Sequence, residues 1–338
     1  MIKALLMVAA VFSCVCAFSQ TEQATPPDQV FKVNVSLVVI DAQVLNKKTR
    51  QPVPSLGLED FILFENGAKQ QITSLSQDKL PLSVVFLFDL TDSVRPVLES
   101  LAGGTLQALQ HLKPEDEAAV MVYAASAKTL QDFTTDRELL VKAIRKASRM
   151  ESNEAAFFNE GMFQAAIQAG KATRHGRRVI IWLTDNVPNI PSDEVRRQYG
   201  RSVPEESLHT ETEALGTLVK TGAVVFTLLQ RSEISEREFM VNFHEPLMML
   251  YRRQYPPGDV YKYTQQTGGE VLESYSSKKV AAKMAELIDH IRTRYALGYH
   301  PTGDSQNRRF HEIRLEVSPE VQFREGKVVV EAKRGYFR

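Results

Sequence analysis

Two kinds of apolar pattern divide the chain, and the first predicts strands. Along residues 31–39, apolar and polar residues alternate, which predicts a strand with one buried face. Residues 61–72 predict a hairpin, because Asn66-Gly67 supplies two residues that tolerate the positive φ of a tight turn. We therefore expect residues 30–78 to form a small β unit.

The second pattern consists of continuous apolar runs, which are typical of strands buried on both faces. These runs lie at residues 84–88, 118–123, 179–183 and 223–229. Apolar residues also repeat at helical spacing at 139–147 and 280–291. Strands that alternate with helices predict an α/β fold, in which a doubly wound, mostly parallel sheet has helices on both sides. We expect this domain to span residues 81–293.

The strand pattern returns near the C-terminus, at residues 295–300, 311–317 and 327–333. We expect residues 294–338 to pair with the N-terminal β unit. Both ends of the chain would then build one small β subdomain that flanks the α/β domain.

The N-terminus predicts an export signal. A basic start is followed by an apolar run at residues 4–18, which is shorter than the roughly 20 residues of a membrane-spanning helix and ends at a small-x-small cleavage site. We expect residues 1–19 to be cleaved after Ser19 and residues 20–29 to be a polar linker. The mature protein would be secreted or periplasmic and would have no membrane span. A less favoured alternative is a lipoprotein anchored through Cys14.

Composition narrows the class of protein. The 338 residues include 41 Lys and Arg and 41 Asp and Glu, so the formal net charge is zero, and 43% of the residues are hydrophobic. These values exclude a mostly disordered chain and argue against a dedicated nucleic-acid binder, which carries a net basic face. Both cysteines, Cys14 and Cys16, lie in the expected signal, so the mature chain would fold without a disulfide.

Candidate chemistry lies where two of the expected strands end. Asp89, Thr91 and Ser93 alternate as the chain leaves the first buried strand, and Asp185 follows another. The carboxyl ends of parallel strands meet at one edge of a sheet, where ligands bind. Hydroxyl and carboxylate oxygens there suit a hard cation such as Mg²⁺. The alternative is that Thr91 or Ser93 only caps the next helix, with Pro96 in its first turn.

The pattern Asp89-x-Thr91-x-Ser93, with Leu183-Thr184-Asp185, resembles the metal-ion-dependent adhesion site of von Willebrand factor type A domains. The wider chain resembles secreted VWFA-related proteins of the acidobacterial type. The segments that carry this wider likeness are residues 61–67, 80–85, 133–137, 297–301 and 333–337.

The resemblance implies a divalent-cation site. Asp89, Thr91, Ser93 and Asp185 match the positions that hold Mg²⁺, or Ca²⁺ or Mn²⁺, in such domains. There the hydroxyls ligate directly, one or both aspartates act through water, and a carboxylate from a partner completes the coordination. The implied function is cation-dependent binding of a protein or cell-surface component through an acidic side chain.

Two positions depart from the family pattern. Ala155 stands where a threonine ligand is expected, and Asp92 stands where a small residue is usual. Asp92, Ser152 or Glu154 could supply the missing oxygen. The alternative is a structural or assembly module whose site is degenerate and holds no metal. We do not expect an enzyme, because the sequence has no HExxH motif, no G-x-S-x-G elbow and no cysteine nucleophile in the mature chain.

Overall fold

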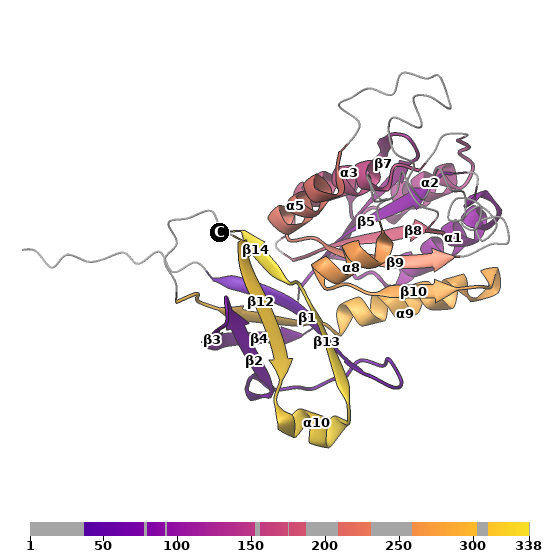
Figure 1. The fold of residues 1–338 in the computed structure, drawn as a ribbon. Helices are drawn as coiled ribbons and strands as arrows, with labels where there is room; N and C mark the ends of the chain where they lie inside the picture. Colours follow the sequence, from indigo (N-terminus) through magenta and orange to yellow (C-terminus); the bar gives the residue numbers. More distant parts are fainter. Residues whose placement is uncertain are drawn as a thin grey trace, which may run out of the picture. The chain divides into compact units, whose positions relative to one another are not determined.

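Three sheets organise the part of the chain that the structure describes (Figure 1). The computed structural model describes residues 37–77, 80–91, 93–152, 156–174, 176–186, 209–230, 259–302 and 310–337. The expected signal peptide at 1–19 and linker at 20–29 lie outside these residues and stay predictions.

The central sheet has six strands. They are β5 (Leu82–Asp89), β6 (Glu117–Tyr123), β7 (Ala127–Thr134), β8 (Arg177–Thr184), β9 (Val224–Gln230) and β10 (Val271–Ser274). Their order is β10-β9-β8-β5-β6-β7, and neighbours run parallel except β7, which is antiparallel to β6. Every residue of β5 is buried, as its continuous apolar run predicts. The expected mostly parallel sheet is confirmed.

Helices cover both faces of this sheet, which confirms the doubly wound α/β class (Figure 1). The helices α1 (Arg95–Ala108), α2 (Arg137–Ala147) and α9 (Val280–Arg292) pack on one face. The helices α3 (Phe158–Gly170), α5 (Glu211–Thr221) and α8 (Val260–Thr267) pack on the other. Side chains alternate along a strand, so Asp89 shares the α3 face of the sheet with Val85 and Leu87.

Two antiparallel sheets share a separate core. One has the order β13 (Val328–Ala332), β1 (Val38–Asn46), β11 (Tyr295–Tyr299) and β4 (Ile72–Gln77). The other has the order β14 (Gly335–Phe337), β12 (Phe310–Val317), β2 (Phe61–Glu65) and β3 (Ala68–Gln70). The short helix α10 (Pro319–Glu325) joins β12 to β13. Strands from the two ends of the described chain therefore pair with one another. The domain bounds at 78, 81 and 294 stay a prediction.

The N-terminal elements differ in part from the sequence pattern. The hairpin is confirmed, with φ of 50° at Asn66 and 81° at Gly67. Of the strand expected at 31–39, residues 31–36 lie outside the described residues, and β1 runs from Val38 to Asn46. Asp41 and Gln43 break the apolar pattern there.

Ion pairs with two buried arginines join the antiparallel sheets to the α/β part, and they explain why the Asp41 side chain can be largely buried, at 17% exposure. The Asp41 carboxylate is 2.8 Å from Arg177 Nε and also accepts from Arg294 Nε. Arg177 comes from β8, and Arg294 precedes β11. Arg294 also donates to the carbonyl oxygen of Gly268 at 2.8 Å. One strand of the antiparallel sheet is thus held to two elements of the α/β part.

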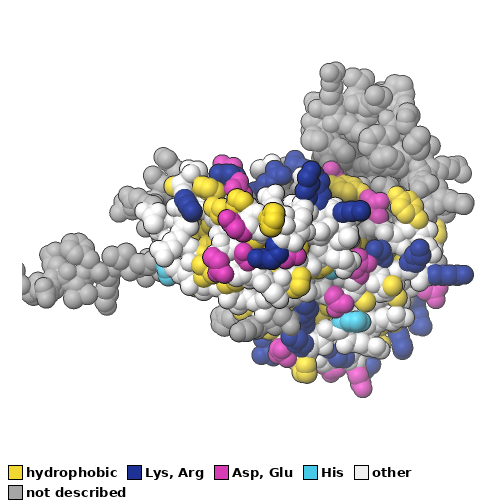
Figure 2. Space-filling view, turned by 90° about the horizontal axis from the view of Figure 1, so that it is seen from below, with side chains coloured by type: hydrophobic (Ala, Val, Ile, Leu, Met, Phe, Trp, Pro, Cys, Tyr) yellow, Lys and Arg dark blue, Asp and Glu magenta, His cyan; other side chains and the backbone are white. Residues whose placement is uncertain are grey.

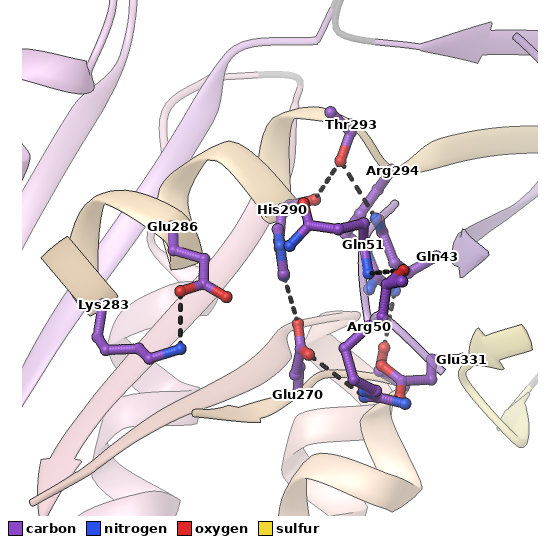
Figure 3. Close-up of polar contacts among 12 residues, drawn as sticks. Gln43, Arg50, Gln51, Glu270, Lys283, Glu286, His290, Thr293, Arg294 and Glu331 are labelled. Carbon is purple, nitrogen blue, oxygen red and sulfur yellow. Dashed lines mark hydrogen bonds and ion pairs between the residues drawn. The ribbon is translucent and has the colours of Figure 1, made fainter. Parts of the chain in front are cut away.

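A second polar cluster links the same two parts of the fold (Figure 3). Arg50 donates to Glu331 of β13 at 2.8 Å and to Glu270 at 3.2 Å. The other carboxylate oxygen of Glu270 lies 2.8 Å from Nδ1 of His290 on α9. Glu270 therefore lies between a guanidinium and an imidazole, which satisfy a carboxylate that is almost fully buried.

The described surface is mixed in charge, and basic and acidic side chains are interspersed on the face shown in Figure 2. None of the helices within the described ranges is long and apolar enough to span a bilayer.

Candidate metal site

The carboxyl ends of β5 and β8 bring the sequence-predicted residues together. Asp89 is the last residue of β5, and Asp185 directly follows the last residue of β8, the neighbouring strand. Asp89 and Asp185 have no exposed surface, and Thr91 and Ser93 are 7% and 1% exposed. The structure thus buries all four at one edge of the sheet.

The loop after β5 folds back onto Asp89. Oδ1 of Asp89 accepts from the backbone N–H of Thr91 at 3.0 Å and from its hydroxyl at 2.7 Å. The hydroxyl oxygens of Thr91 and Ser93 lie 3.4 Å apart. Because the Thr91 hydroxyl gives its proton to Asp89, its oxygen lone pairs remain available to a cation.

The capping alternative is wrong as stated. The N-cap of α1 is Val94, with no side-chain capping bond, and Pro96 lies in the first turn. The hydroxyl of Thr91 donates to Asp89 instead.

Sequence reasoning missed two donors to the other oxygen of Asp89. Oδ2 accepts from the Tyr123 hydroxyl at 2.8 Å and from the Thr184 hydroxyl at 2.7 Å. Tyr123 ends β6, directly opposite Asp89 in the strand register. Thr184 belongs to the Leu183-Thr184-Asp185 motif, but its hydrogen bond to Asp89 was not foreseen. A hydroxyl at the carboxyl end of an apolar strand is the signal that could have found Tyr123.

Burial governs the electrostatics of this site. Burial raises the pKa of Asp89, and the hydrogen bonds from Thr91, Thr184 and Tyr123 oppose that rise. Burial, together with the negative charge of Asp89, raises the pKa of Tyr123 well above its ordinary value. The tyrosine hydroxyl therefore stays protonated and acts as a donor.

The oxygen atoms present suit a small, hard cation. A carboxylate has about four acceptor directions, and Asp89 already accepts four hydrogen bonds. A cation would thus meet the hydroxyls of Thr91 and Ser93 directly and Asp89 through them or through water. Within the described ranges, no three His, Cys, Asp or Glu side chains form a cluster that could hold a metal, so the hydroxyls are needed.

The candidates for an extra ligand are mostly outside the described residues. Asp92, Glu154 and Ala155 lie there, so their roles stay predictions. Ser152 is described, and its backbone oxygen accepts from Arg95 at 3.5 Å.

Comparison with known families gives a match for the part of the chain that holds this site. Residues 84–187 match the family model described as the von Willebrand factor type A domain. This part of the chain is therefore similar to a von Willebrand factor type A domain. The matched range begins within β5 and ends just after Asp185, so it includes all four predicted site residues of the type A domain. The finer likeness to secreted acidobacterial proteins stays a prediction. No curated protein matches the chain.

Solved structures that resemble this chain at low identity include proteins named as type A domains. The type A protein from Catenulispora acidiphila is 10% identical, with a TM-score of 0.44, covering 90% of this chain and 75% of that one. The vWF domain of the type V pili tip protein Mfa5 from Porphyromonas gingivalis is 12% identical, with a TM-score of 0.41, covering 63% and 95%. The PilB minor pilin from Streptococcus sanguinis is 11% identical, with a TM-score of 0.43, covering 64% and 62%. This chain therefore spans less than two thirds of the minor pilin's length.

Proposed function

We propose that this protein is a non-enzymatic binding module whose type A domain recognises a protein or cell-surface component through a divalent cation. One observation carries the proposal: the buried oxygens of Asp89, Thr91 and Thr184 converge at the carboxyl edge of the sheet. Thr91 and Ser93 would hold Mg²⁺, or Ca²⁺ or Mn²⁺, with Asp89 and Asp185 balancing its charge. The cation would supply a positive charge to an acidic side chain of the partner.

The chain's own residues support this assignment in two ways. First, Thr91 is held by two bonds to one Asp89 oxygen, so its hydroxyl oxygen is oriented before any cation arrives. Second, the residues that orient it are buried, and a buried site excludes competing water. We also propose that the protein acts outside the cytoplasm, which the apolar run and cleavage pattern at its N-terminus support.

Two threonine substitutions test the proposal. Thr91→Val and Thr184→Val each remove a hydroxyl that donates to Asp89 at 2.7 Å, but only Thr91 is a proposed ligand. Thermal unfolding is measured without metal and with Mg²⁺, Mn²⁺ or Ca²⁺. A cation at about 100 times its Kd stabilises the wild type by roughly 2.7 kcal/mol. We expect Thr91→Val to lose this gain and Thr184→Val to keep it, although both lower the starting stability.

The same measurement separates the proposal from its alternative. A wild-type protein that responds to none of the three cations would be a structural or assembly module with a degenerate site. Equal loss of the response in both variants would show that the hydroxyls act only by supporting Asp89.

A further inference from the structure

A chain of hydrogen bonds leads from the candidate metal site into the core beneath α3. Nε1 of Trp182 donates to the Tyr123 hydroxyl at 2.9 Å, and this hydroxyl donates to Asp89 Oδ2 at 2.8 Å. All three side chains are almost completely buried. Both donors point toward the carboxylate, an order in which successive hydrogen bonds polarise and strengthen one another.

Packing leaves Tyr123 little freedom. A Cβ on Gly161 of α3 would lie 2.7 Å from the Tyr123 ring, so the glycine allows the helix to rest on this ring. The rings of Phe158 and Trp182 meet Tyr123 edge-on, each with a centroid distance of 6.2 Å. Because the ring cannot turn away, its hydroxyl stays directed at Asp89.

The contact between Tyr123 and Asp89 links the tyrosine hydroxyl to the charge at the candidate metal site. Tyr123 fills one of the two acceptor positions of Oδ2, and Thr184 fills the other. A cation near Thr91 and Ser93 would draw electron density from Asp89. This change would weaken or strengthen the hydrogen bonds of the tyrosine hydroxyl and the indole N–H in turn, since these are the next groups in the chain of hydrogen bonds.

We propose that Tyr123 is a positioning residue of the cation site, which holds Asp89 in place and couples the charge there to Trp182. This inference rests on the proposed function, because it requires a cation at Thr91 and Ser93. Trp182 is the one tryptophan of the sequence, so its emission and its indole N–H resonance report on this site alone. Indole emission responds to hydrogen bonding at Nε1 and to the local field.

The test follows Trp182 emission during titration with Mg²⁺, Mn²⁺ or Ca²⁺, alongside thermal unfolding. In the wild type, the cation concentration at half of the emission change should equal that at half of the thermal shift. Tyr123→Phe removes the central hydroxyl. We expect it to weaken cation binding by about tenfold, the effect of one lost hydrogen bond, and to abolish the emission change even at saturating cation.

Tyr263→Phe is the matched control. The Tyr263 ring also meets Trp182 edge-on, at 5.9 Å, and is fully buried, but its hydroxyl donates to Asn159 at 2.8 Å instead of to Asp89. This variant should keep the emission change. If it loses the change as Tyr123→Phe does, or if Tyr123→Phe keeps it, the coupling through Tyr123 is refuted.

A measurement on the wild type alone covers the case in which Tyr123→Phe does not fold. The single indole N–H resonance should move on cation addition, with the midpoint of the thermal shift. A thermal shift without this movement rejects the coupling but leaves the proposed function standing. Absence of both responses rejects the proposed function and the coupling together.

Discussion

The Asp41 ion pairs predict a large and specific loss of stability. Asp41 on β1 forms ion pairs with both Arg177 and Arg294, whose side chains are only 4% and 1% exposed. Asp41→Asn keeps the size of the side chain but removes its charge. Both guanidiniums then stay buried without a carboxylate to balance their charge. The amide N–H groups of the asparagine would also face the N–H groups of Arg177 and Arg294, which are donors too.

The magnitude follows from burial. Removing one partner of a buried pair typically costs about 3–5 kcal/mol, because an uncompensated charge stays in a low-dielectric environment. Since the whole free energy of unfolding of a domain is about 5–15 kcal/mol, this is a large share. Glu316→Gln is the matched control, because the Arg314–Glu316 pair is 56% and 45% exposed. An exposed pair contributes about 0–1 kcal/mol.

Urea unfolding, followed by circular dichroism, gives both free energies from the midpoint and slope. We expect a loss of about 3–5 kcal/mol for Asp41→Asn and less than about 1 kcal/mol for Glu316→Gln. At about 1 M salt, where the Debye length is about 3 Å, only the exposed pair should lose its contribution. A loss below about 1 kcal/mol for Asp41→Asn would refute the assignment of these arginines to a buried network.

Three further predictions concern packing, pH and capping. Gly161→Ala should destabilise the protein by about 1–3 kcal/mol in urea unfolding, because the new methyl group meets the Tyr123 ring. Gly103→Ala in α1 is the control: its methyl group meets nothing within 4 Å, and it should stabilise the helix by about 0.5–1 kcal/mol. Burial raises the pKa of Glu117, but four hydrogen bonds outweigh it and lower the pKa overall, so its contribution is lost as pH falls through the folded-state pKa. The stability difference between wild type and Glu117→Gln should therefore shrink when unfolding is repeated below about pH 4. Asp136→Ala should cost about 1 kcal/mol in the same assay, because it removes the N-cap of α2, whose carboxylate accepts from two backbone N–H groups.

Four strands of the central sheet, β5, β6, β8 and β9, could be predicted because almost all of their residues are buried, and such strands carry a continuous apolar run. β7 was missed for the opposite reason. It is a half-exposed edge strand that runs antiparallel to β6, and its sequence mixes apolar and polar residues without a clear period. The continuation of β1 to Asn46 was not predicted, because Asp41 and Gln43 lie inside it, each satisfied by residues more than a hundred positions away.

The sequence placed the candidate site residues from the ends of two predicted strands. Asp89 ends β5, Thr91 and Ser93 lie in the loop after it, and Asp185 directly follows β8. Tyr123 ends a predicted strand, but its contact with Asp89 was not foreseen, because that contact depends on the register between β5 and β6. Periodicity gives the face of a strand but not its register.

The pairing of β4 with β11 has a consequence for the engineering of this fold. Gln77, at the end of β4, lies opposite Tyr295, at the start of β11. The intervening α/β segment thus leaves the antiparallel sheet at the end of β4 and returns at the start of β11, at neighbouring positions. A two-residue turn in its place would join β4 to β11 as an ordinary hairpin. Another domain could be inserted between β4 and β11 without changing the register of the sheet around them.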